Sequence, residues 1–66
     1  MTKMMNEAKR IMNETVTNFG FESEYTIEVA KAYETFTNYP NDETYFAFTM
    51  KASEMIMQAY ADMNEE

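Results

Sequence analysis

Apolar side chains recur along most of this chain at alternating intervals of three and four residues, which is the period of an amphipathic helix. The first such row predicts a helix over about residues 3–18. The positions of this row are Met1, Met5, Ala8, Met12, Thr15 and Phe19. Gly20 follows the row and suits the left-handed position after a helix, so we expect a Schellman stop in which Phe21 contacts Val16.

The second segment carries two competing patterns. Ser23 can cap a helix over about residues 23–37. The inner row of that helix would be Tyr25, Val29, Ala32 and Phe36. The stretch 21–29 also alternates between apolar and polar residues, which is the period of a half-buried strand. The spacing of three and four residues continues beyond that stretch and favours the helix.

A break follows around Pro40, because proline biases the residue before it away from helical backbone, and Asn41 or Asp42 can cap the next helix. The same break could instead turn a hairpin between residues 35–38 and 44–49. Those stretches are rich in Thr and aromatic residues, as strands are. This alternative gives an α+β fold.

The third segment is the longest and most regular, and it predicts a helix over about residues 42–64. Its inner row is Tyr45, Phe48, Ala52, Met55, Ala59 and Met63. Acidic residues at its start suit the helix dipole, whereas Asp62, Glu65 and Glu66 oppose the dipole at its end. We therefore expect the last turn to fray.

Together these segments predict an all-α fold, a small three-helix arrangement in which residues 1–66 form one domain. Chains of this size bury only about 60% of the surface that they expose when unfolded, and they usually need disulfides, a metal or oligomerisation. The sequence has no Cys and no His, so a second copy or a larger partner is the remaining support. It also has eight Met and no Leu, and Met is favoured on surfaces that adapt to a partner.

The third helix carries a second apolar row away from its inner row. This outer stripe consists of Phe46, Met50, Met57 and Tyr60, with Ser53 among them. A helix of a three-helix bundle needs one broad face to bury, so a second face predicts contact with another protein or another subunit. A bundle that wraps this helix more deeply would explain the stripe as well.

The net charge of −7 is unevenly distributed, with a balance of +1 over residues 1–20 and −8 over residues 21–66. Such an acidic field repels nucleic acid and anionic membranes and attracts basic surfaces. Glu43, Glu54 and Glu65 recur every eleven residues and fall on one side of the third helix. A solvated helix face explains this row, and so does imitation of the charges of a nucleic-acid backbone.

Several chemistries are excluded by residue types. Without His or Cys, and with Ser23 and Ser53 as the only serines, hydrolytic triads and the usual metal ligands are missing. We therefore expect no enzyme activity, no cofactor and no metal. No signal peptide or bilayer-spanning stretch is visible, and the lack of Cys suits a reducing compartment, so we expect a cytoplasmic protein.

These patterns predict a non-enzymatic acidic binding protein that regulates or inhibits a larger macromolecule by occupying its surface. The expected contacts are the outer stripe together with Glu43 and Glu54. In size and charge the chain is similar to the small acidic inhibitors that phages and mobile elements encode, which would place it in a host cytoplasm and make a nucleic-acid-handling protein its target. The alternative is a structural or regulatory homodimer that uses the outer stripe as its subunit interface.

Overall fold

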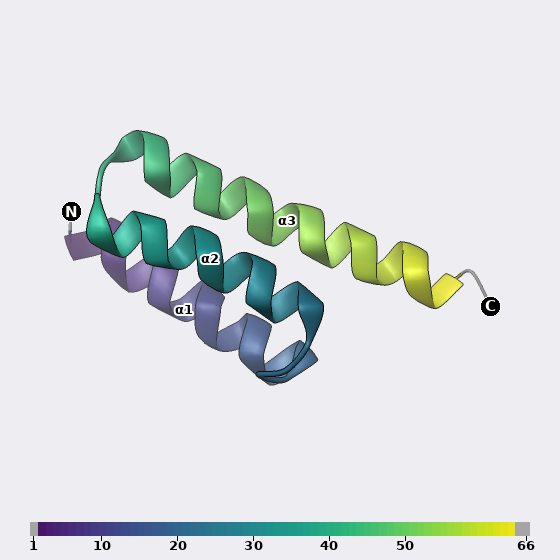
Figure 1. Ribbon diagram of the computed structural model, residues 1–66. Coiled ribbons are helices and arrows are strands. Elements are labelled where there is room, and N and C mark those ends of the chain that lie inside the picture. The colour runs from purple at the N-terminus through teal and green to yellow at the C-terminus, as the bar shows by residue number, and fades with distance from the viewer. Residues whose placement is uncertain (1, 65–66) are drawn as a thin grey trace.

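The computed structural model describes residues 2–64 and is all-helical over that range (Figure 1). Helix α1 spans Thr2–Phe19, α2 spans Glu24–Asn38 and α3 spans Asp42–Asn64. The predicted three-helix fold is confirmed, and the alternative hairpin around Pro40 is wrong because both of its proposed strands are helical. Met1, Glu65 and Glu66, which entered the predictions above, lie outside the described residues.

Gly20 ends α1 in the predicted left-handed conformation, with φ at 88°. Its backbone N–H donates a hydrogen bond to the carbonyl of Val16 at 2.7 Å. This bond is that of the simpler αL motif, whereas a Schellman stop would bring the N–H of Phe21 to the same carbonyl. Phe21 itself is 79% exposed, so the stop is a backbone device rather than an apolar contact.

Ser23 and Asn41 begin the other two helices. The Ser23 side chain accepts a hydrogen bond from the N–H of Tyr25 at 3.1 Å, which satisfies one of the free amides of the first turn of α2. Asn41 caps α3, because its Oδ1 accepts from the N–H of Thr44 at 2.9 Å while the Thr44 hydroxyl accepts from the N–H of Asn41 at 3.2 Å. This reciprocal pair is a capping box.

Each helix contributes one face to a shared core. The fully or nearly fully buried apolar residues are Ala8, Val29, Phe36, Phe48, Ala52 and Ala59. Aromatic pairs join α2 to α3, with ring centroids 5.6 Å apart for both Tyr33–Phe48 and Phe36–Tyr45. Ala8 and Ala52 belong to the same buried cluster as Phe36 and Phe48, so small side chains complete the core.

The strand-like alternation in residues 21–29 has a different origin. Val29 is buried and Tyr25 is half-buried, as the helical prediction requires. Phe21 and Ile27 are exposed, although they share the alternating pattern. Ile27 lies about 160° around α2 from Val29, because each residue of a helix advances by about 100°. The helix therefore places Ile27 on the surface of the molecule, and the alternation does not mark one side of a strand.

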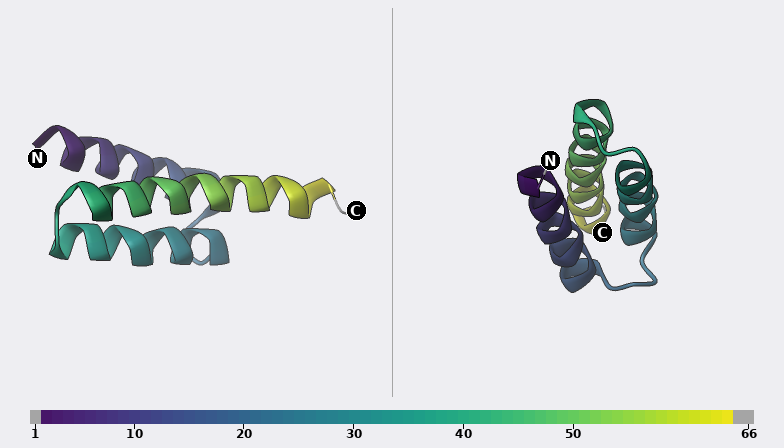
Figure 2. Two further views of the ribbon diagram at one scale, coloured as in Figure 1. Left: turned by 90° about the horizontal axis from the view of Figure 1, so that it is seen from above. Right: turned by 90° about the vertical axis from the view of Figure 1, so that its left-hand side faces the viewer.

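Helix α3 projects beyond the other two helices at its C-terminal end (Figures 1 and 2). Seen end-on, α1 and α2 flank it on either side (Figure 2). Met63 was predicted to belong to the core, and this prediction is wrong because Met63 is 69% exposed in the projecting part. The periodicity of α3 continues past the point where α1 and α2 can cover it.

Candidate protein-binding surface

The outer stripe of α3 is exposed along its whole length. The exposed fractions of Phe46, Met50, Met57 and Tyr60 lie between 56% and 70%. Phe46, Met50 and Met57 lie about 160–180° around the helix from the buried Phe48, because each residue advances by about 100°. The stripe thus faces away from the core, and the interpretation in which the bundle wraps it more deeply is wrong for this chain.

Helix α3 is consequently apolar on two opposite sides. Its inner row provides Phe48, Ala52 and Ala59 to the core, with Met55 half-buried beside them. The two rows leave little of the circumference for charged residues. A helix with this distribution is typical of one that packs through both faces, whereas in the structure α1 and α2 both pack toward the inner row.

Acidic residues border the outer stripe on one flank. Glu43 and Glu54, the predicted partner-binding acids, are both exposed and lie on that flank. Lys51 forms an ion pair with Glu54 at 2.9 Å, and their hydrogen bond raises the pKa of Lys51. Glu43 forms no ion pair among the described residues, so this flank of the stripe carries a net negative charge.

The other flank of the stripe meets the end of α1. Here Phe19 of α1 and Ile56, Tyr60 and Met63 of α3 line a hollow of about 340 Å³, together with Asn18 and Ala59. Sequence reasoning missed Phe19 and Ile56 as surface residues, because their place depends on which helix lies beside α3. Tyr60 belongs both to the stripe and to this hollow, so the apolar surface continues from α3 onto α1.

A second apolar surface lies between α1 and α2, away from the outer stripe. Its hollow of about 490 Å³ is lined mainly by Met12, Val16, Phe21, Ile27, Ala30 and Tyr33. Thr26 also lines it, and its buried hydroxyl has no hydrogen-bond partner among the described residues. The sequence signal for this surface was the apolar face of the alternating stretch 21–29.

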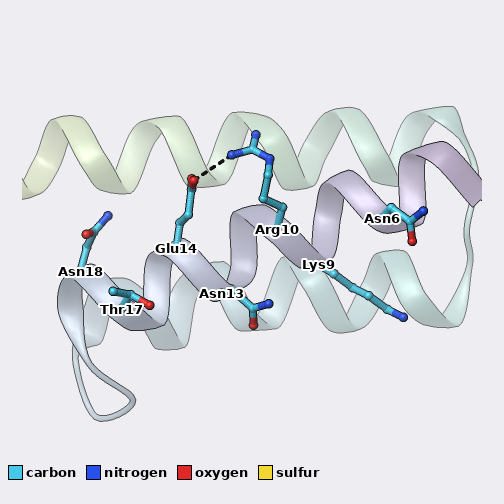
Figure 3. Close-up of a pocket in the computed structure, with 7 residues that line it drawn as sticks. All are labelled: Asn6, Lys9, Arg10, Asn13, Glu14, Thr17 and Asn18. Atoms are coloured by element: carbon cyan, nitrogen blue, oxygen red, sulfur yellow. Dashed lines mark hydrogen bonds and ion pairs between the residues drawn. The ribbon is translucent and has the colours of Figure 1, made fainter.

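A third hollow, on the outer side of α1, is lined by polar and charged residues (Figure 3). Arg10 points toward Glu14 there and binds it at 2.9 Å, and it also pairs with Glu7, whereas Lys9 points the other way (Figure 3). The hydrogen bond from Arg10 lowers the pKa of Glu7. Because its guanidinium is already paired with two carboxylates, Arg10 is not free to bind an anion in this hollow.

Tyr25 ties the start of α2 to the projecting part of α3, because its hydroxyl donates a hydrogen bond to the Asp62 carboxylate. That bond raises the pKa of Tyr25, and the negative charge of Asp62 acts in the same direction. The bond therefore supports the folded state below the ordinary tyrosine pKa and is lost as the pH rises through the raised value.

We expect Asp62→Asn to lower the pKa of Tyr25 toward its ordinary value, as measured by tyrosinate absorbance during an alkaline titration. Asp42→Asn removes the same charge from the opposite end of α3 and should leave the titration unchanged. An identical titration curve for Asp62→Asn and the original protein would show that the bond does not form in solution.

Metal and membrane chemistry find no support in the described part of the chain. Residues 2–64 contain no group of three or more Asp or Glu side chains placed to hold a metal ion. Within the same residues, no helix is both long and apolar enough to cross a membrane. Comparison with protein-family models, curated proteins and solved structures finds no match for this chain.

Proposed function

We propose that this protein is a non-enzymatic binding protein that docks on a larger protein through the outer stripe of α3. The observation that carries this proposal is the exposure of four large apolar side chains in one row opposite the core. Soluble monomers rarely expose such a row without a partner. Aromatic and Met side chains are also enriched at the centres of protein interfaces.

The size of the stripe is adequate for an anchor. Burying one large apolar side chain contributes about 1.5–3 kcal/mol, so the four members of the stripe together contribute roughly 6–12 kcal/mol toward the entropic costs of association. Acidic residues at the rim contribute mainly to the association rate and to the choice of partner. Glu43 and Glu54 occupy that rim position beside the stripe.

The charge of the chain suggests the kind of target. A net charge of −7 favours a partner with a basic surface, and proteins that bind DNA or RNA carry such surfaces. Occupation of that surface would exclude the nucleic acid and inhibit the target. The alternative, a homodimer without inhibitory role, would use the same stripe between two acidic copies.

Affinity capture from a host lysate tests the proposal, with the protein as bait at about 50 mM and about 500 mM salt. We expect the same basic protein to be recovered at both salt concentrations, because the apolar stripe provides the anchor. A bait with Met50→Asp and Met57→Asp together serves as the control and should not retain that protein. Equal recovery on both baits, or no specific protein on either, would contradict the proposal.

A further inference from the structure

The exposed row on α3 follows the spacing of a helix–helix interface. Phe46, Met50, Ser53, Met57 and Tyr60 are separated by four, three, four and three residues. This is the spacing of the two inward positions of a heptad repeat. All five residues are on the same side of one uninterrupted helix, so a second helix lying along α3 can contact every one of them.

Ser53 leaves a gap between the larger side chains of this row. It is small and exposed, and it lies between the larger side chains of Met50 and Met57. In helix packing, a large side chain of one helix enters the space between residues of the other. The row therefore accepts a large apolar residue of the partner opposite Ser53.

The two flanks of the row differ in charge. Glu43 and Glu54 lie on one flank, and the neighbouring Lys51 is already engaged with Glu54 at 2.9 Å. The other flank opens onto the apolar hollow formed with Phe19 and Ile56. A helix that fits both flanks has Lys or Arg along one edge of its apolar face and apolar residues along the other edge.

A second copy of this chain does not meet that requirement. Two copies would bring together chains that each carry a net charge of −7. An antiparallel pair centred on Ser53 would place Glu54 near its equivalent, and a parallel pair would do the same with Glu43. Like charges at such positions are unfavourable, so charge complementarity selects a foreign basic helix over self-association.

This inference rests on the proposed function of the outer stripe. We propose that the partner binds the outer stripe through a single basic amphipathic helix, which lies along α3 as a fourth helix. The recognised features are large apolar residues spaced three and four apart, with basic residues on the side of Glu43 and Glu54. The anchor is apolar, while the acidic flank sets the orientation of the bound helix.

Two synthetic helical peptides of 21 residues test this inference against the full chain. Both have Leu at the three–four spacing, and one has Lys along one edge where the other has Glu. We expect the Lys peptide to bind at least about tenfold more tightly than the Glu peptide at low salt, with a smaller ratio at high salt. In the chain, Glu43→Gln together with Glu54→Gln should reduce this ratio of affinities. Met57→Asp should lower the affinity for both peptides.

The remaining outcomes each overturn the inference. Equal affinity for the two peptides would remove the role of charge. If neither peptide bound while a captured protein still required Met50 and Met57, the proposed function would stand and the helical nature of the partner would be wrong.

Because the sequence has no Cys, Ser53→Cys gives a clean test for a second copy. Rapid formation of a disulfide-linked dimer, together with a dimer mass for the original protein, would identify self-association instead.

Discussion

Replacing Phe48 with alanine is expected to unfold this protein at 25 °C, whereas the same replacement at Phe46, two residues earlier, leaves it folded. The Phe48 ring is fully buried and lies 5.6 Å from the ring of Tyr33, whereas Phe46 is 65% exposed. Removing a buried Phe side chain costs about 3–5 kcal/mol. In a chain of this length a single core rarely supplies more than about 3–5 kcal/mol of stability, so the loss at Phe48 removes most or all of it.

Thermal unfolding followed by far-ultraviolet circular dichroism provides the measurement. The Phe46→Ala variant should keep the helical signal and unfold near the temperature of the original protein. Its cost is that of an exposed substitution, roughly 0.5 kcal/mol or less. If the two variants lost equal stability, Phe46 would have to be buried in solution, as it would be in a tight dimer.

Substitution of Met50 and Met57 by Asp is expected to weaken partner binding by about 100-fold or more without changing the unfolding temperature. Each substitution removes apolar contact from the outer stripe and places a carboxylate in a surface that binding would desolvate. A 100-fold loss corresponds to about 2.7 kcal/mol, which is modest for two such changes. Calorimetric titration of the captured partner measures the loss.

Phe21→Asp is the matched control for this experiment. It makes the same kind of change on the other apolar surface, at a loop residue that is 79% exposed, and adds one negative charge where the double substitution adds two. We expect binding to change by less than about threefold, since rim charges act mainly on association. The reverse pattern, with loss at Phe21 alone, would transfer the docking site to the hollow between α1 and α2.

The boundaries of the helices could be predicted because local residues determine them. Gly20, Ser23 and Asn41 each act on the backbone within a few residues, and the structure has all three where the spacing predicts a boundary. Met63 shows the limit of this reasoning. Its position in the apolar repeat of α3 is that of a core residue. Its burial, however, depends on how far α1 and α2 extend beside α3, and the spacing of residues within α3 does not predict this.

The candidate surface was predictable in part for the same reason. The outer stripe follows from the angular position of residues within one helix, so Phe46, Met50 and Met57 could be identified as a separate face. The hollow that extends this face onto Phe19 depends on which helix lies next to α3. The identity of the partner could not be predicted, because this sequence holds only the charge and the spacing of the residues that would contact it.

The projecting end of α3 should also give the molecule a gradient of local stability. Amide hydrogens near the middle of α3 can exchange with solvent only when the bundle opens, whereas those in the last turn need only local fraying once the bond between Tyr25 and Asp62 opens. Hydrogen exchange in the free protein should therefore be fastest toward Asn64. A bound partner that covers this turn would slow its exchange, and the last protected amide would mark how far along α3 the partner extends.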